Sequence, residues 1–113
     1  MDRADAAWLA GLLDGEGCFD APRSNPRIRV KMSDHDVVLR AANLMGASTY
    51  YENIPGRKSL LVAQITGARA VEVMREILPQ LGSRRSQRAS AITLAYLHKR
   101  KLPSNIVRME KAA

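Results

Sequence analysis

The chain has 113 residues, of which 46% are hydrophobic and 26% charged, and its 18 Lys and Arg against 11 Asp and Glu give a net charge of +7. This composition excludes a largely disordered chain, and the length suits a single domain, residues 1–113, with one hydrophobic core. No apolar stretch is long enough to cross a bilayer, and the first residues lack the pattern of a signal peptide. The single cysteine excludes an intrachain disulfide. We therefore expect an intracellular protein with no membrane partner, although the sequence leaves the compartment open.

The first predicted element is a helix over residues 1–15, almost continuously apolar from Ala6 to Leu13. The part of this helix that carries the sequence motif described below spans about residues 5–16. Gly15 and Gly17 are predicted to end it, because glycine tolerates the positive backbone dihedrals at which many helices stop. A helix this apolar must be covered on more than one side.

A hairpin is predicted next, from a strand that begins at Cys18, a turn around residues 24–26 and a second strand over residues 27–32. Cys18 is expected to be a small core residue. In the second strand three cations alternate with three apolar residues: Arg27, Arg29 and Lys31 with Ile28, Val30 and Met32. Because side chains alternate between the two faces of a strand, one face of this hairpin is predicted to be cationic and the other to face the core.

A second helix, a second hairpin and two further helices are predicted next. Their predicted ranges are a helix from Ser33 or Asp34 to Met45, strands over residues 49–53 and 59–66, and helices over residues 68–78 and 86–101, followed by a tail at about 103–113 that is expected to be flexible. The order αββαββα, with a further helix, predicts an α+β fold in which helices cover one face of an antiparallel sheet and leave the other face free and basic.

Two carboxylates, Asp14 and Glu16, lie at the C-terminal end of the first helix. The exposed carbonyls of a helix C-terminus already concentrate negative potential there, so each such charge typically costs about 0.3–1 kcal/mol. A divalent cation would reverse this effect, because carboxylate and backbone carbonyl oxygens are the protein ligands that Mg²⁺ takes, and Glu16 is the best ligand candidate. The alternative interpretation is an ordinary exposed turn after a core helix, which spacing alone favours.

The run LAGLLDGEG at residues 9–17 closely resembles the signature of the LAGLIDADG homing endonucleases, and the element order matches the αββαββα core of that family over roughly residues 8–97. The resemblance implies a saddle-shaped sheet lying along the major groove of double-stranded DNA, with two motif helices packed side by side. A chain with one motif is then a homodimer on a long pseudo-palindromic site. The residues implied at the dimer interface are Trp8, Gly11, Leu12 and Gly15.

In that family the last acid of the motif binds catalytic Mg²⁺ with the backbone carbonyl of the preceding residue, positions that correspond here to Glu16 and Gly15. The implied activity is Mg²⁺-dependent, site-specific hydrolysis of both DNA strands. Arg84, three residues before Gln87, corresponds to a basic catalytic residue that is usually lysine; an arginine cannot act as a general base but can stabilise phosphoryl charge. Arg85 is the neighbouring alternative.

A second departure from the family pattern lies at the end of the second strand. Met32 or Ser33 stands where the family often has a glutamine that positions water. The efficiency of cleavage therefore stays open, as do the target sequence, the overhang, the host and whether a mobile intron encodes the chain.

The residues expected to contact DNA share the outward face of the sheet or the last helix. They are Asp20, Ser24, Asn25, Arg27, Arg29 and Lys31 from the first hairpin, Tyr51, Asn53, Arg57, Lys58 and Ser59 from the second, and Arg85 and Arg88 from the last helix. Arginine can bind guanine and asparagine can bind adenine, each through two hydrogen bonds, whereas the helix arginines suit phosphates. Any one of these cations alone could be a solvated surface charge, so the expectation depends on their sharing a face.

Three alternatives remain at this point. The chain could bind DNA as a regulator without cutting it, or bind structured RNA as an intron maturase, since nothing in the sequence separates a DNA ligand from an RNA ligand. It could also be a helix-mediated assembly module, because Gly11 and Gly15 would let another helix approach closely.

Overall fold

The computed structural model describes the backbone of residues 1–105 and the side chains of residues 1–100. Four strands form one antiparallel sheet in the order β1-β2-β4-β3. Their bounds are β1 (Gly17–Asp20), β2 (Arg27–Met32), β3 (Ser48–Glu52) and β4 (Leu60–Thr66). Each hairpin pairs its own strands, and the two hairpins join at the centre of the sheet, where β2 pairs with β4.

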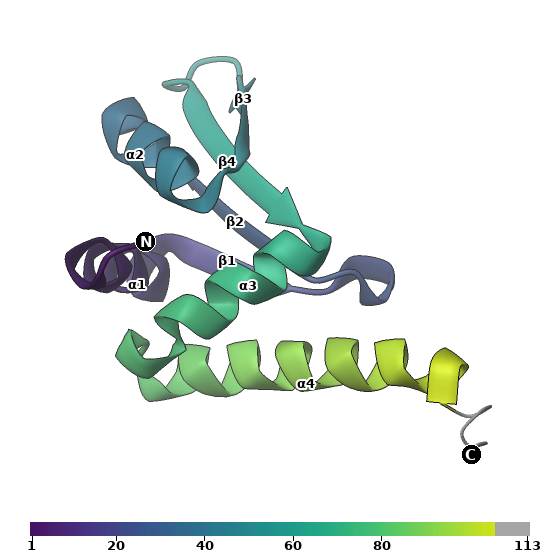
Figure 1. Ribbon diagram of the computed structural model, residues 1–113. Helices are drawn as coiled ribbons and strands as arrows, with labels where there is room; N and C mark the ends of the chain where they lie inside the picture. The colour runs from purple at the N-terminus through teal and green to yellow at the C-terminus, as the bar shows by residue number, and fades with distance from the viewer. Residues whose placement is uncertain (106–113) are drawn as a thin grey trace.

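The helices lie to one side of this sheet (Figure 1). They are α1 (Arg3–Glu16), α2 (His35–Met45), α3 (Gly67–Ile77) and α4 (Ser83–Asn105), with short 3₁₀ turns η1 (Pro22–Ser24) and η2 (Leu78–Gln80). α1, α2 and α3 pack on the sheet, whereas α4 runs along α3 and beside the edge strand β1. The predicted α+β fold, with an antiparallel sheet and helices on one face, is confirmed.

The buried faces of the helices and of the sheet pack together into a single hydrophobic core. α1 buries Ala6, Leu9, Ala10 and Leu13, which recur at the spacing of one helical face. The sheet opposes them with alternate residues of three strands: Phe19, Ile28, Val30, Leu61, Ala63 and Ile65 are all buried. α2 and α3 each contribute a further row of buried apolar side chains to this core.

The predicted end of α1 at about residue 16 agrees with the structure, but its predicted cause is wrong: Gly17 follows Glu16 in an extended conformation with φ −86°, so no positive φ ends this helix. The predicted bounds of the last helix are also wrong. α4 begins at Ser83 and extends to Asn105, so Pro103 lies within the helix rather than after it. Most of the tail expected at about 103–113 falls outside the described residues. No helix within residues 1–105 has both the length and the apolar character needed to cross a membrane.

Space, rather than backbone freedom, explains the glycine at position 17. A Cβ added there would lie 2.6 Å from Cδ2 of Leu13 and 2.9 Å from both Cα and the carbonyl oxygen of Leu13. Two of these neighbours are backbone atoms of α1 and cannot move aside cheaply. Because Gly17 has no Cβ, the first residue of β1 can pack directly against Leu13 in the last turn of α1, and the helix leads into the strand without a loop.

We expect Gly17→Ala to lower the free energy of unfolding by about 1–3 kcal/mol, the usual cost of overpacking a close contact. Gly11→Ala is the matched control, since nothing lies within 4 Å of a Cβ at that position. In the single chain this helical substitution should raise stability by about 0.5–1 kcal/mol. Urea unfolding in dilute solution measures both, and a Gly17→Ala protein as stable as the parent would contradict the steric account.

Candidate functional site

The two acids at the end of α1 have different surroundings. Both carboxylate oxygens of Asp14 accept from the backbone N–H of Gly82, at 3.1 and 2.9 Å, just before α4 begins. A negative charge at the start of a helix is favourable, so Asp14 stabilises the junction between α1 and α4. The expectation that a carboxylate at the end of α1 is unfavourable is therefore wrong for Asp14. It holds for Glu16, which is exposed and has no hydrogen-bond partner among the described residues.

Glu16 fits the ligand set of a hard divalent cation but cannot complete one alone. It is the last residue of α1, where carboxylate and backbone carbonyl oxygens come together. Within residues 1–105, no cluster of three or more His, Cys, Asp and Glu side chains could hold a metal ion. A cation there would need water, a phosphate or a second chain as further ligands, which is the pattern Mg²⁺ follows when it binds phosphate substrates.

Two arginines of α4 are bound to the backbone of β1. Arg85 Nη1 donates to the carbonyl oxygen of Gly17, and Arg88 Nε donates to that of Phe19 at 3.2 Å. β1 is an edge strand, so carbonyls on its open side have no strand partner. The two guanidinium groups supply the missing donors and fix α4 against the end of the motif.

Arg84 differs from its neighbours. It is exposed and has no hydrogen-bond or ion-pair partner in the described part of the chain, and it lines a shallow pocket of about 290 Å³ together with Arg85 and Arg88. Of the two sequence candidates for a catalytic cation, Arg84 is thus available to a ligand while Arg85 is held by the backbone. The Nε atom of Arg85 is buried without a partner, consistent with a structural position.

The outward face of the sheet carries the predicted cations. Cross-strand pairing places Cys18, Arg29, Gln64 and Ser48 in one row across all four strands. Asp20 and Arg27 lie in the next row. Cys18 is exposed on this face, so the expectation of a buried core cysteine is wrong.

Most strand cations on this face are already paired. Arg27 binds Asp20 through two hydrogen bonds of 2.8 and 2.6 Å, and Lys31 Nζ lies 3.1 Å from a carboxylate oxygen of Glu52. Arg29 has no ion pair among the described residues. The strand position most available for binding an anion or a base edge is therefore Arg29.

The hydrogen bond from Arg27 holds the pKa of Asp20 below its ordinary value, against a smaller opposing effect of burial. The charges of Arg27, Arg29 and Arg88 lower it further. Asp20 therefore remains a carboxylate under ordinary conditions, and it neutralises the most crowded part of the basic face.

Tyr51 and Ser59 do not lie where they were predicted. Tyr51 pairs with core-facing Leu61, and its ring packs edge-on against His35 of α2 at 5.4 Å. Ser59 accepts from His35 Nε2 through its carbonyl oxygen at 3.0 Å. The outward tyrosine is instead Tyr50, which pairs with Val62 and is 46% exposed. Adjacent tyrosines satisfy either strand register, so the sequence pattern alone did not distinguish them.

Gln64 was missed altogether. It lies on central strand β4, opposite Arg29 on one side and Ser48 on the other, and is half-buried. The signal was present, because it is the one polar side chain between Leu60 and Ile65 in an otherwise apolar strand. Its amide can both donate and accept, as base edges require.

The remaining predicted contacts lie at the two ends of the sheet. Ser24 and Asn25 are exposed in the β1–β2 turn, and Asn53, Arg57 and Lys58 are exposed in the β3–β4 loop. They stand at opposite limits of the outward face, so a ligand touching both groups would have to run across the whole sheet (Figure 1).

α1 leaves a stripe of small residues uncovered. Ala4, Ala7, Gly11 and Gly15 are exposed and recur at helical spacing, on the side opposite the buried Leu9 and Leu13. Trp8 and Leu12 flank the stripe as half-buried side chains, and Arg40 of α2 stacks over the Trp8 ring at 4.0 Å. The stripe offers close approach to another backbone, with larger apolar groups along its borders.

The ion pair of Asp20 gives a pH-dependent contribution to stability. Because the folded-state pKa lies below the unfolded value, the stabilisation is fully present above the unfolded pKa and is lost as pH falls through the folded pKa. We expect the gap in free energy of unfolding between the parent and Asp20→Asn to be constant near neutrality and to shrink between about pH 5 and about pH 2. Denaturant titrations across this range measure it; a gap that widens in acid would contradict the assignment.

No protein-family model and no curated protein matches this sequence. The fold of this chain does resemble solved structures of homing endonucleases. I-CvuI, in complex with the I-CreI target in the presence of Mg, matches with a TM-score of 0.60 and 19% identity over 91% of this chain and 70% of that chain. I-CvuI with its own target in the presence of Ca matches with a TM-score of 0.60 and 19% identity over 92% of this chain and 73% of that one.

A third resemblance is to a group I intron-encoded homing endonuclease, I-CeuI, complexed with DNA. Its TM-score is 0.61 at 15% identity, and the match covers 96% of this chain and 61% of that chain. The motif at residues 9–17 occupies α1 and its junction with β1, in agreement with the element order that the sequence predicted. The chain therefore has the fold of the LAGLIDADG homing endonucleases.

Proposed function

We propose that the chain is a site-specific DNA endonuclease that hydrolyses both strands of a pseudo-palindromic duplex as a homodimer, with Mg²⁺ as its cofactor. The observation that carries this proposal is Glu16: an exposed carboxylate without a partner among the described residues, placed at the unfavourable end of a helix where the basic sheet begins. Proteins with this fold have been solved with DNA, and with Mg or Ca present, which supports the same ligand here.

The outward face of the sheet would hold the duplex. Its β-ribbons are narrow enough to enter the major groove, where Arg29 and Gln64 could contact base edges. The Asp20–Arg27 pair would present a fixed acceptor and donor side by side. Asn53, Arg57 and Lys58 would reach the outer part of the site from the β3–β4 loop.

The end of α1 would hold the cofactor through Glu16 and the backbone carbonyl of Gly15, the donor types that Mg²⁺ prefers. An ion held by these two groups would supply Lewis-acid chemistry, with a more acidic bound water and compensation of phosphate charge. Arg84 would stabilise the charge that develops on the phosphoryl group, since its guanidinium is a planar cation that is not engaged elsewhere in the described chain. Arg85 and Asp14 would act by fixing α4 against the motif.

Two features support a homodimer: the number of acids and the free stripe on α1. One chain supplies one Glu16, whereas cutting two strands at once requires two such centres. The stripe of Ala4, Ala7, Gly11 and Gly15 would let the α1 helices of two copies meet at short range, with Trp8 and Leu12 at the border. A two-fold axis between the helices would bring the two Glu16 side chains close to the same duplex.

We expect Glu16→Gln to abolish cutting while leaving duplex binding intact, because it removes the charge that a cation needs but changes no packing contact. The assay is digestion of a randomised-duplex library with Mg²⁺ or with EDTA, read by sequencing the cut ends. Cuts at one pseudo-palindromic sequence, present only with metal and absent in Glu16→Gln, are the expected result.

Asp14→Asn is the matched control for Glu16→Gln. It removes the other motif carboxylate, whose partner is the Gly82 N–H, so it should lower stability by about 1 kcal/mol and leave metal-dependent cutting in the folded protein. Duplex binding without cuts under all conditions would replace the proposal with a DNA-binding regulator. Preferential binding of structured RNA would point instead to a maturase.

The dimer has its own test in Gly11→Leu. A leucine on the free stripe would separate the two helices without touching the core of one chain, because nothing lies within 4 Å of a Cβ at Gly11. We expect sedimentation equilibrium to show a dimer for the parent, a monomer for Gly11→Leu, and a dimer for Asn43→Leu, which adds the same side chain to an exposed position of α2. A dimer that persists in Gly11→Leu would place the interface elsewhere.

A further inference from the structure

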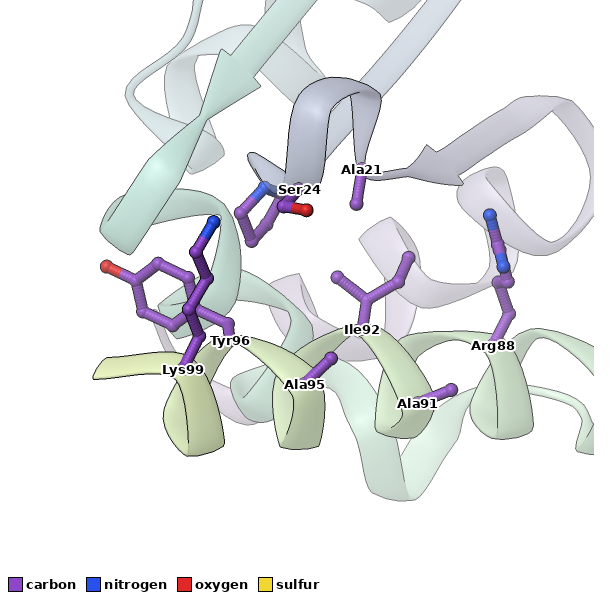
Figure 2. A pocket seen from close by; sticks show the side chains of 9 residues that line it. Ala21, Ser24, Arg88, Ala91, Ile92, Ala95, Tyr96 and Lys99 are labelled. Atoms are coloured by element: carbon purple, nitrogen blue, oxygen red, sulfur yellow. The ribbon is translucent and has the colours of Figure 1, made fainter. Parts of the chain in front are cut away.

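A basic groove lies between the β1–β2 turn and the C-terminal half of α4, away from the motif. Two adjoining cavities of about 360 and 510 Å³ share Ser24, Tyr96 and Lys99 as lining residues. In Figure 2, Ala21 and Ser24 of the turn lie across from Ile92, Tyr96 and Lys99 of α4. The two cavities therefore form one open groove, with the turn as one wall and the helix as the other.

The lining of this groove is cationic on both walls. Arg23 comes from the turn, and Arg88, Lys99 and Arg100 come from α4. Hydroxyl groups of Ser24 and Tyr96 add uncharged donors. Among the described residues, no acidic side chain lines either cavity. Four positive charges with no counter-charge in the lining select an anionic ligand.

The openness of the groove favours a polymer over a small anion. Exposed single ion pairs in water contribute little, so one phosphate would be held weakly by these side chains. A polyanion that neutralises several of them at once also releases its condensed counterions, which is the main source of sequence-independent affinity for nucleic acids. A run of backbone phosphates therefore suits this groove best.

The turn keeps an unfavourable backbone conformation at the groove. Arg23 and Ser24 both have positive φ, 53° and 65°, the region that glycine adopts without cost. Side chains retained at strained positions commonly serve function at the expense of stability. Here the side chains in question line the groove.

The direction of α4 sets where the groove would meet DNA. Arg85 contacts Gly17 beside the motif, and Lys99 follows 14 residues later on the same helix, about 21 Å away along its axis. Arg88 lines both this groove and the pocket around Arg84, so positive charge is continuous along one side of α4. For a duplex that runs parallel to α4, at 3.4 Å per base pair, this separation corresponds to about six base pairs.

We propose that this groove binds the phosphodiester backbone of the DNA flanking the central part of the site, about six base pairs outward from the Glu16 end of α1. The inference rests on the proposed function, because it takes the duplex on the sheet as its starting point. It adds a contact that carries no sequence information and lengthens the footprint at both ends of a dimer.

The test is the salt dependence of duplex binding in EDTA, measured by fluorescence anisotropy for Lys99→Gln and Arg23→Gly. Each lost phosphate contact should reduce the slope of log K against log salt by about 0.9 per groove, or about 1.8 for a dimer. Arg75→Gln on α3, an exposed cation outside the groove, should leave the slope unchanged. Arg23→Gly should also raise the thermal midpoint, because glycine relieves the positive φ, so misfolding could not explain its weaker binding.

Duplex length identifies which DNA segment is bound. On a duplex of about 30 base pairs both variants should lose slope, whereas on one of about 10 base pairs they should match the parent, since the flanking phosphates are absent. Equal slopes for parent and variants on the long duplex would overturn the groove proposal alone. Equal losses on both lengths would overturn the flanking position. If the parent protein binds no duplex at all, both the groove proposal and the proposed function are overturned.

Discussion

The closure of the open edge of β1 is the contact on which the site depends. An edge strand leaves carbonyl groups without partners, and here Arg85 and Arg88 of α4 donate to those of Gly17 and Phe19. Asp14 accepts from the Gly82 N–H at the start of the same helix. These three contacts join elements nearly 70 residues apart and hold the end of α1, the start of β1 and the start of α4 as one unit. Glu16 projects from that unit.

The cations of the chain fall into two groups, those held by contacts within the protein and those without an ion pair. Some cations are structural, because backbone carbonyls or carboxylates hold them: Arg85 and Arg88 on α4, Arg27 by Asp20 and Lys31 by Glu52. Others, such as Arg29 and Arg84, have no ion pair among the described residues. Ion pairing therefore leaves fewer free cations on the sheet than the number of its Lys and Arg residues suggests. Exposed cations lie near the motif, in the β3–β4 loop and along the far half of α4.

Sequence reasoning identified the fold and the cationic face because both depend on local periodicity. Alternation in residues 27–32 determines which side of β2 is buried, and the structure agrees: Ile28 and Val30 are buried, and Met32 is half-buried against the core. It could not decide between Tyr50 and Tyr51, since that choice depends on the register with β4, nor could it find the partner of Asp14, which lies 68 residues away. Gly17 shows the same limit: it was predicted to end the helix through a positive dihedral, but a glycine is required there because Leu13 lies too close for a side chain. Long-range packing, not local preference, decides these cases.

The partners of α4 on β1 are main-chain atoms. Carbonyl oxygens are present whatever residue occupies a position, so Cys18 and Asp20, whose side chains lie on the outward face, can be exchanged without loosening the helix. Side chains on the outward face next to Glu16 can therefore change without changing the backbone contacts that position Glu16. Such a fold can acquire a new ligand preference through substitutions on the outward face, while the position of Glu16 stays unchanged.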